Sequence, residues 1–188
     1  MTHRLILGCD PGQSGAVAAL ADGEFAGVID MPVSPRKAGG FIVAPRLLWM
    51  GVQELVKSHP GAYVMAVIES VSAMPDQGVS GAFRFGQSDG ILRGVLGSHA
   101  LPVKEVSAQQ WKKYHGLTKQ PKDAARTMAI SRFPKAAEML ARKKDGGRAD
   151  ALMIALWAHL TEQVGSAQPD VVDVETARAD IGAESANG

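Results

Sequence analysis

Two apolar runs of strand length decide the fold: LILGCD at residues 5–10 and VMAVIE at residues 64–69, each ending in a carboxylate. A third carboxylate, Asp150, opens the apolar helical run DALMIALW at residues 150–157. Ionised carboxylates at the ends of core elements are costly unless something positive lies between them. A bound divalent metal ion would meet that demand, so we treat the three carboxylates as candidate ligands of one site.

The strand-like runs predict a mixed sheet of about five strands. Runs at residues 4–9, 16–20 and 25–30 are separated by Asp-Pro-Gly and Asp-Gly turn formers, which is typical of an antiparallel meander. The continuous apolar run at residues 63–68 indicates a strand buried on both faces, and residues 101–106 predict a further strand.

Apolar residues also recur with helical spacing between and after these strands. The predicted helices cover residues 44–58, 77–96, 107–116, 122–133 and 148–160. The third of them begins with SAQQ, which has the spacing of a capping box. Strands and helices in this order predict an α/β fold in which helices flank the sheet.

The composition is that of an ordinary globular domain. A length of 188 residues suits one domain with a full core, and the single cysteine argues against a disulfide framework and for a reducing compartment. No apolar run approaches the length that spans a bilayer, and the N-terminus lacks a signal-peptide pattern. We therefore expect a cytoplasmic protein, with no membrane among its partners.

The formal net charge of +1 conceals a strong polarity along the chain. Residues 104–148 hold 12 bases against four acids, whereas residues 161–188 hold six acids against one base. Basic charge next to a carboxylate site favours a phosphate-bearing polymer as partner, although a solvated basic face is the ordinary alternative. We divide the chain into a folded domain, residues 1–161, and an acidic tail, residues 162–188, which we expect to be disordered.

Each carboxylate also has an ordinary structural explanation. Asp10 begins an Asp-Pro-Gly turn, Glu69 is compatible with an exposed strand end or an ion pair, and Asp150 complements the dipole of its helix. However, open mixed sheets bind ligands beyond the carboxyl ends of their strands, and helical spacing turns Asp150 toward the sheet. The three acids together favour a functional site more than any one of them does alone.

The chain resembles the RuvC-type Holliday-junction resolvases, members of the ribonuclease H-like superfamily. The resemblance extends over residues 4–160 and rests on four motifs: ILGCDPG at 6–12 followed by SG at 14–15, VIE at 67–69, FGQ at 85–87 with Gly90, and ADAL at 149–152. No single motif is specific, since Asp-x-Gly openings also occur in actin-like ATPases, but the set is. It implies a ribonuclease H-like mixed sheet and a homodimeric endonuclease that nicks two opposing strands of a four-way DNA junction.

The resemblance also implies roles for individual residues. Asp10, Glu69 and Asp150 match the family's metal-binding catalytic carboxylates, which would hold two magnesium ions, with manganese as a substitute, about 4 Å apart. Lys122 resembles a catalytic lysine near the scissile phosphate, and either Lys112 or Lys113 resembles another. The residues expected to contact DNA phosphates are Lys112, Lys113, Lys119 and Arg126. Trp111, beside these lysines, is expected to serve in packing.

Two positions depart from the family pattern. Gly147 stands where the family has a fourth metal ligand, one helical turn before the last acid; Asp145 is a candidate substitute, with a helix N-cap as an equal alternative. Ser72 stands where the family often has an aromatic wedge, for which Met74, Phe83 or Phe85 are candidates if they are not core residues. The short basic insert at residues 143–148 favours a phage-type member.

The sequence thus predicts a crossover junction endodeoxyribonuclease, in a bacterial cell or a phage-infected host, with residues 78–97 as the dimer helix by resemblance. Two alternatives stay open: a junction-binding protein with weak or no catalysis, motivated by Gly147, and a ribonuclease H-like RNA-processing nuclease. An actin-like ATPase is disfavoured, because about 160 ordered residues leave little room for the second lobe that clamps a nucleotide.

Overall fold

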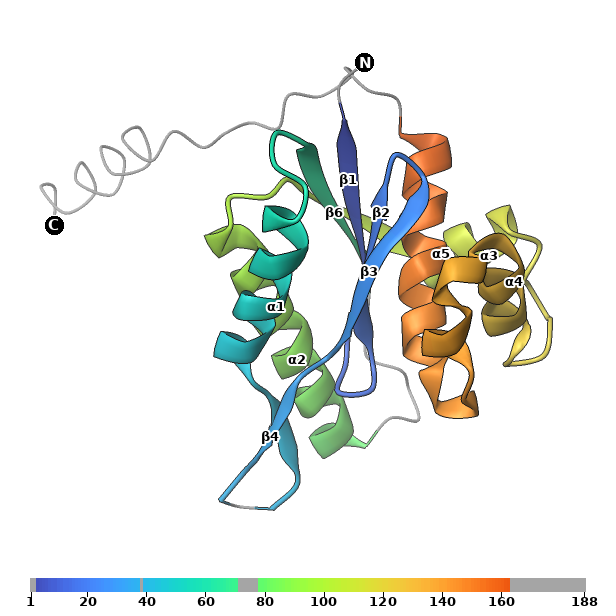
Figure 1. The fold of residues 1–188 in the computed structure, drawn as a ribbon. Coiled ribbons are helices and arrows are strands. Elements are labelled where there is room, and N and C mark those ends of the chain that lie inside the picture. The colour runs from blue at the N-terminus through green and yellow to red at the C-terminus, as the bar shows by residue number, and fades with distance from the viewer. Residues whose placement is uncertain (1–2, 38, 71–77, 163–188) are drawn as a thin grey trace, which may run out of the picture.

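A five-stranded sheet forms the centre of the molecule in the computed structural model, which describes residues 3–37, 39–70 and 78–162 (Figure 1). In spatial order its strands are β3 (Glu24–Asp30), β2 (Ala16–Ala21), β1 (Arg4–Asp10), β6 (Tyr63–Ser70) and β7 (Val103–Ser107). β1 and β3 run antiparallel to β2, whereas β1, β6 and β7 are parallel to one another. The predicted meander and mixed sheet are therefore confirmed.

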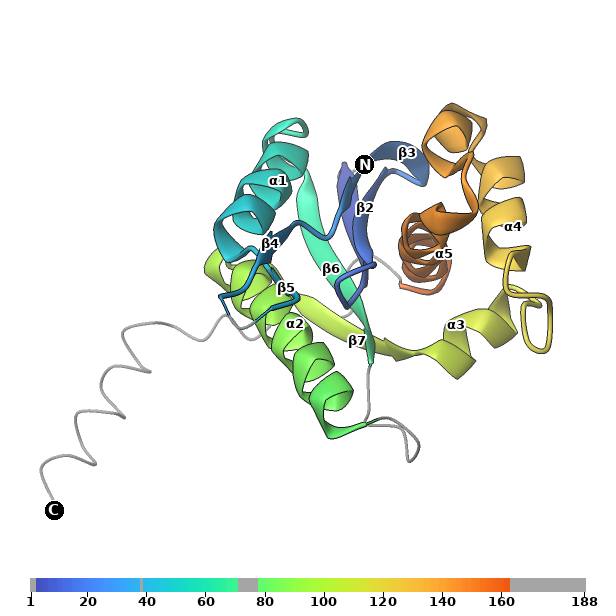
Figure 2. The same cartoon turned by 90° about the horizontal axis from the view of Figure 1, so that it is seen from below.

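Helices cover both faces of this sheet (Figure 2). One face carries α1 (Pro45–Lys57) and α2 (Val79–Ser98). The other carries α5 (Gly146–Thr161), with α3 (Ala108–Tyr114) and α4 (Ala124–Arg132) beside it. Within the described ranges, no helix combines the length and the apolar composition needed to cross a membrane.

Several short elements were not predicted from the sequence. β4 (Val33–Pro35) and β5 (Phe41–Val43) form a small antiparallel hairpin, and two 3-10 helices, η1 (Pro134–Leu140) and η2 (Lys143–Asp145), precede α5. Strands of three residues are too short to show an alternating pattern. The predicted helix at residues 77–96 is α2, although Gln77 lies outside the described residues.

Alternate residues of β1 face two separate apolar cores. Leu7 and Cys9 belong to the core beneath α1 and α2, whereas Ile6 belongs to the core beneath α5. Gly8 lies directly against α5, because a methyl group there would lie 2.1 Å from the carbonyl oxygen of Ala151. The helix can approach the strand this closely only where β1 has no side chain, and this contact brings the start of α5 to the end of β1.

The described part of the chain ends just after α5. Glu162 forms an ion pair with Lys104, and its carbonyl oxygen accepts a hydrogen bond from Arg4 Nη2 at 3.1 Å. Glu162, placed at the start of the predicted tail, therefore packs against the domain. The remainder of that tail, residues 163–188, lies outside the described residues, and its predicted disorder stays a prediction.

Candidate functional site

Three elements bring the predicted carboxylates to one edge of the sheet. Cys9 of β1 pairs with Ile68 of the parallel strand β6. Asp10 and Glu69 are the next residues of these two strands, so they lie side by side where the strands end. Asp150 lies in the second turn of α5, which crosses β1 at Gly8. All three carboxylates are half-buried. The edge is the one where ligands of open α/β sheets bind, as the sequence predicted.

Burial and mutual repulsion shift the protonation of two of these groups. Burial, together with the negative charges of Asp150 and Glu69, raises the pKa of Asp10 to about 8, although the positive charge of Lys112 opposes the shift. The pKa of Asp150 is raised to about 6, chiefly by burial and also by the charge of Glu69, while Lys112 and Lys122 oppose the shift. The three carboxylates are therefore close enough to repel one another in a partly dry setting.

This donor set fits a hard divalent cation by its chemistry, because carboxylate oxygens are the ligands that magnesium and manganese prefer. A cation would also relieve the repulsion that raises the pKa of Asp10 and Asp150. In the described residues, no three His, Cys, Asp or Glu side chains are already gathered at the distances of a metal centre. Small side-chain movements at the three carboxylates would thus accompany metal binding.

The fourth-ligand position of the family does lie at this edge, but it has no room for a side chain. A methyl group at Gly147 would lie 3.1 Å from Asp10 Oδ2, 2.3 Å from the carbonyl oxygen of Ser14 and 3.0 Å from Gly15 Cα. The first turn of α5 therefore packs backbone against backbone on the loop that follows β1. Glycine is required at 147 by this contact.

Asp145, the predicted substitute, is occupied elsewhere. Its buried carboxylate accepts hydrogen bonds from Arg142, at 2.9 Å from the backbone N–H and 2.7 Å from Nη2. These bonds hold the pKa of Asp145 below its ordinary value. Asp145 stands at the N-cap position of α5, yet its side chain makes no capping bond to that helix. The structure thus places Asp145 at the predicted N-cap position but pairs its carboxylate with Arg142, and its role as a metal ligand stays a prediction.

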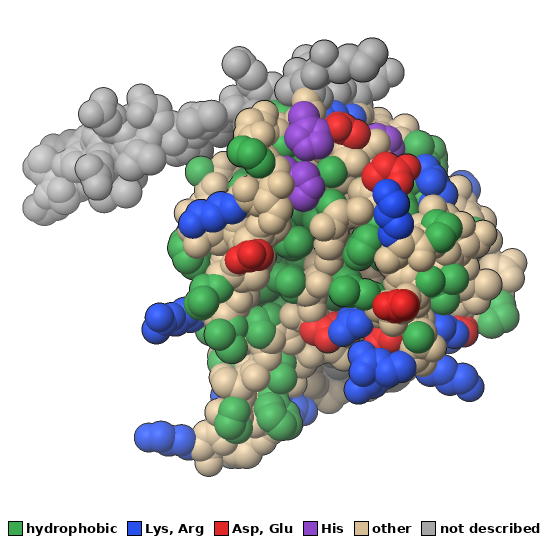
Figure 3. Space-filling view, viewed as in Figure 1, with side chains coloured by type: hydrophobic (Ala, Val, Ile, Leu, Met, Phe, Trp, Pro, Cys, Tyr) green, Lys and Arg blue, Asp and Glu red, His purple; other side chains and the backbone are tan. Residues whose placement is uncertain are grey.

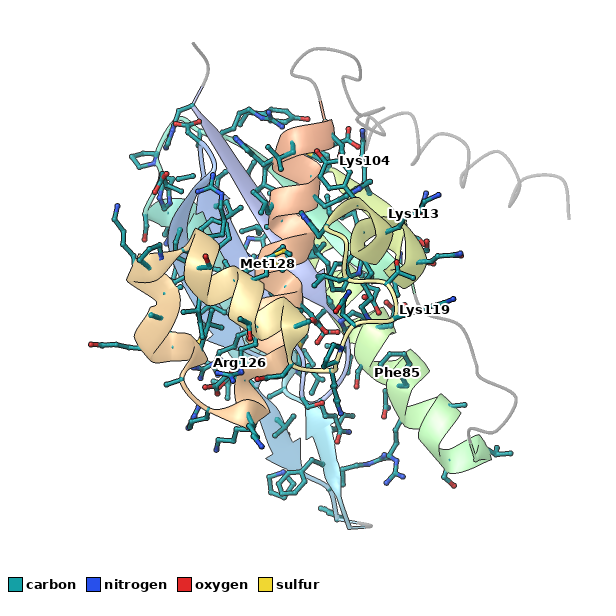
Figure 4. The ribbon with its side chains drawn as sticks, turned by 90° about the vertical axis from the view of Figure 1, so that its right-hand side faces the viewer. Phe85, Lys104, Lys113, Lys119, Arg126 and Met128 are labelled. Carbon is teal, nitrogen blue, oxygen red and sulfur yellow. The ribbon has the colours of Figure 1, made fainter. Side chains whose placement is uncertain are left out.

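The predicted basic residues separate into those that face the carboxylates and those that do not. A cavity of about 390 Å³ is lined by Asp150 together with Lys112, Lys119 and Lys122. Lys113 follows Lys112 on α3 but is exposed and does not line this cavity (Figure 4). The structure therefore distinguishes the two lysines that the sequence left as alternatives. More widely, Figure 3 shows Lys and Arg side chains gathered low on this face, near the start of α5, with Asp and Glu side chains among them.

Arg126 is committed to contacts within the domain. Its Nε and Nη2 each donate to the carboxylate of Asp123 at 2.6 Å, and its Nη1 donates to the carbonyl oxygen of Leu140 at 2.8 Å. This arrangement ties α4 to η1. The guanidinium is thus less available to a phosphate than Lys119 or Lys122, which are exposed beside the cavity.

The candidates for an aromatic wedge lie in different settings. Ser72 and Met74 fall outside the described residues. Phe85 packs on the loop after β1, since a methyl group at Gly12 would lie 3.1 Å from Phe85 Cε2. Phe83, two residues nearer the start of α2, is 65% exposed and thus free to contact a partner.

One residue at the site was assigned to packing alone by the sequence. Trp111 is fully buried, but its indole Nε1 also donates a hydrogen bond to Glu69 Oε2 at 2.7 Å. The pairing joins residues 42 positions apart in the chain, so no local pattern indicates it. The sequence offered one indirect signal for this bond: a tryptophan expected to pack in the core needs an acceptor for its indole N–H, and the acids of the candidate site could supply one.

Comparison with known proteins gives one similar sequence and two similar folds. No protein-family model matches the chain. Over 149 residues, 70% of this chain, it is 32% identical to the chloroplast Holliday junction resolvase MOC1 of Chlamydomonas reinhardtii. The match spans 17% of the length of that relative.

Solved structures show the fold. RuvC of T. thermophilus, in complex with a Holliday junction substrate, superposes with a TM-score of 0.54 at 18% identity, covering 89% of this chain and 99% of RuvC. Another Thermus thermophilus RuvC structure has a TM-score of 0.47 at 17% identity, covering 81% and 91% of the two chains. The chain thus has the ribonuclease H-like fold of RuvC and is similar in sequence to a Holliday junction resolvase, which confirms the resemblance inferred from its motifs.

Proposed function

We propose that this chain is a divalent-metal-dependent endonuclease that resolves four-way DNA junctions by paired, symmetric nicks. The observation that carries the proposal is the convergence of Asp10, Glu69 and Asp150 at one sheet edge, facing Lys112 and Lys122, in a RuvC-type fold. The similarity to a Holliday junction resolvase supports the choice of substrate. Residues 1–161 would form the nuclease domain, with the acidic residues 162–188 appended to it.

The three carboxylates would hold magnesium or manganese, as two ions in each site. Such ions supply Lewis-acid activation of a water molecule and neutralise charge on the reacting phosphate. Lys112 and Lys122, which already act on the charge of Asp150, would bind the non-bridging oxygens of that phosphate. Lys119 lines the same cavity and would contact the next phosphate along the strand.

We further propose that α2 joins two copies of the chain. Four glycines of this helix, Gly86, Gly90, Gly94 and Gly97, have open space where a side chain would project, and Val79 and Phe83 are exposed. A glycine face lets a second helix approach closely, and a twofold axis through it would present two sites to opposing strands. Gly90→Glu should therefore give a monomer in light scattering that still binds metal; a variant that stays dimeric contradicts the use of this face.

The function is tested by cleavage of a labelled four-way junction, with a linear duplex and an RNA–DNA hybrid of the same sequence as competing substrates. Wild type should make paired nicks in the junction alone, in magnesium or manganese, and Asp10→Asn should abolish them. Asp22→Asn is a matched control, because Asp22 lies at the β2–β3 turn and bonds the backbone N–H of Arg4.

Three results would contradict the proposal. Tight junction binding without nicks in either metal favours the alternative of a binding protein, which Gly147 motivates. Preferential cleavage of the hybrid favours an RNA-processing nuclease. Nicking by Asp10→Asn at the wild-type rate would remove Asp10 from the site. A cytoplasmic location, in a bacterial cell or a phage-infected host, stays part of the proposal.

A further inference from the structure

Trp111 is completely buried, yet its one polar group has a partner. Its side chain has no exposed surface, and its indole N–H points at Glu69 Oε2, 2.7 Å away. An indole has one donor and no acceptor, so burial requires an oxygen partner. Here that partner is the carboxylate of a proposed metal ligand.

The start of α3 fixes where this indole lies. Glu69 of β6 pairs with Val106 of the parallel strand β7, and α3 begins directly after β7. A capping box sets the first turn: Ser107 Oγ accepts from the N–H of Gln110 at 3.2 Å, and Gln110 Oε1 accepts from the N–H of Ser107 at 2.9 Å. Trp111 directly follows Gln110, so this capped first turn of α3 directs its side chain toward the end of β6.

A second contact, made by His115, braces Trp111. The His115 ring lies edge-on to the indole, with centroids 6.5 Å apart, and His115 Nε2 donates to the carbonyl oxygen of Met153 at 2.9 Å. Met153 belongs to α5, one turn after Asp150. Trp111 is thus held between the strand that carries Glu69 and the helix that carries Asp150.

We propose that Trp111 is a positioning residue, whose indole N–H holds Glu69 in the orientation that binds metal. Hydrogen bonds of this kind fix the orientation of metal-binding side chains, and one oxygen of Glu69 is already engaged. Lys112 Nζ lies 4.9 Å from the centroid of the same indole, so Trp111 also sets the place of the lysine that faces Asp150. The inference rests on the proposed metal-dependent function and adds to it a residue that touches neither metal nor DNA.

Trp111→Phe tests this role, because it keeps a buried ring and removes the donor. Trp157→Phe is the matched control: Trp157 packs on the same core, and its indole makes no hydrogen bond to the residues that the structure describes. Mn²⁺ binding to the full chain is measured without DNA, by electron paramagnetic resonance of the free ion. We expect Trp111→Phe to bind Mn²⁺ about tenfold more weakly than wild type, and Trp157→Phe to bind it as wild type does.

Two further readouts separate positioning from folding. Junction binding in EDTA should be the same for both variants, and raising the Mn²⁺ concentration should restore nicking by Trp111→Phe. Equal Mn²⁺ affinity for wild type and Trp111→Phe overturns the inference and leaves the proposed function intact. A wild-type chain that binds no Mn²⁺ overturns the metal-dependent function, and this inference with it.

A measurement on the unmodified site covers the case in which Trp111→Phe does not fold. The chain has three tryptophans, so nitrogen-15 labelled protein gives three indole N–H signals, and Trp49→Phe and Trp157→Phe identify the third as Trp111. Adding Mg²⁺ should move that signal most, and Glu69→Gln should remove its response. A Trp111 signal that ignores Mg²⁺ while wild type binds Mn²⁺ would overturn the inference.

Discussion

Gly147→Ala should destabilise the protein, although alanine is normally the better helix residue. The new methyl group would meet the carbonyl oxygen of Ser14 at 2.3 Å and Gly15 Cα at 3.0 Å, both of them backbone atoms. Overpacking of this kind costs about 1–3 kcal/mol, against a gain of about 0.5–1 kcal/mol from helix propensity. Because backbone atoms at 2.3 Å cannot move aside easily, the cost lies in the upper half of its range, and we expect a net loss of about 1–2.5 kcal/mol in the free energy of unfolding.

Gly146 provides the matched control one position earlier. A methyl group there meets nothing within 4 Å, and its φ of −56° is ordinary for a helix, so Gly146→Ala should gain about 0.5–1 kcal/mol. In a chain of 188 residues, 1 kcal/mol corresponds to about 2–4 °C in melting temperature. Thermal and urea unfolding followed by circular dichroism should thus shift in opposite directions for the two variants.

The same reasoning applies to the acid that the family carries at this position. Gly147→Asp should lose more stability than Gly147→Ala and should lose nicking, instead of gaining a metal ligand. A Gly147→Ala variant as stable as wild type would refute the close approach of α5 to the loop after β1. The departure from the family pattern would then need another explanation than steric exclusion.

Three further predictions follow from charges at and near the site. In metal-free protein the pKa of Asp10 is about 8 in the folded state and 3.8 in the unfolded chain, so between these values the folded state binds one proton more. The free energy of unfolding should therefore fall as the pH rises from about 4 to 8. Urea titrations should show a weaker dependence of this free energy on pH for Asp10→Asn than for wild type. Asp145→Asn should destabilise the domain, because the buried carboxylate that accepts the hydrogen bonds of Arg142 becomes an amide with a single acceptor oxygen, yet it should leave Mn²⁺ affinity unchanged; weaker Mn²⁺ binding would return Asp145 to the ligand set. Lys112→Ala should slow nicking about a hundredfold and Lys113→Ala hardly at all, and equal losses in single-turnover assays would contradict the placement of these lysines.

Much of the fold could be predicted because its signals are local. The meander follows from short alternating runs with turn formers between them, and β6 follows from a continuous apolar run. The placement of Asp10 and Glu69 follows as well, since parallel strands end at one edge. The position of Asp150 on the inner side of α5 was likewise fixed by helical spacing.

The remaining features arise from pairings between distant segments, which leave no local pattern. Gly147 was recognised as a missing ligand, but its contact with Ser14 depends on how α5 crosses β1. The hydrogen bond from Trp111 to Glu69 depends on the pairing of β6 with β7, because Glu69 lies near the end of β6 and Trp111 lies in α3, directly after β7. The choice of Arg142 as the partner of Asp145 depends on the 3-10 turn η2, which is too short to predict.

The contrast between two groups of acids argues for a functional site without reference to any relative. Asp30, Asp123 and Asp145 each accept hydrogen bonds from an arginine, and each has its pKa lowered chiefly by that partner. In the described part of the chain, Asp10 and Asp150 form no ion pair, and their pKa values are raised. The structural carboxylates are thus neutralised by arginines, whereas the charges that oppose the repulsion between Asp10 and Asp150 come from lysines that also line a cavity. Such a site has space for the cation and the phosphate of the proposed function. Under the proposed function, the stability lost to this repulsion is explained by the cation and the phosphate that the site would bind, and not by how the domain folds.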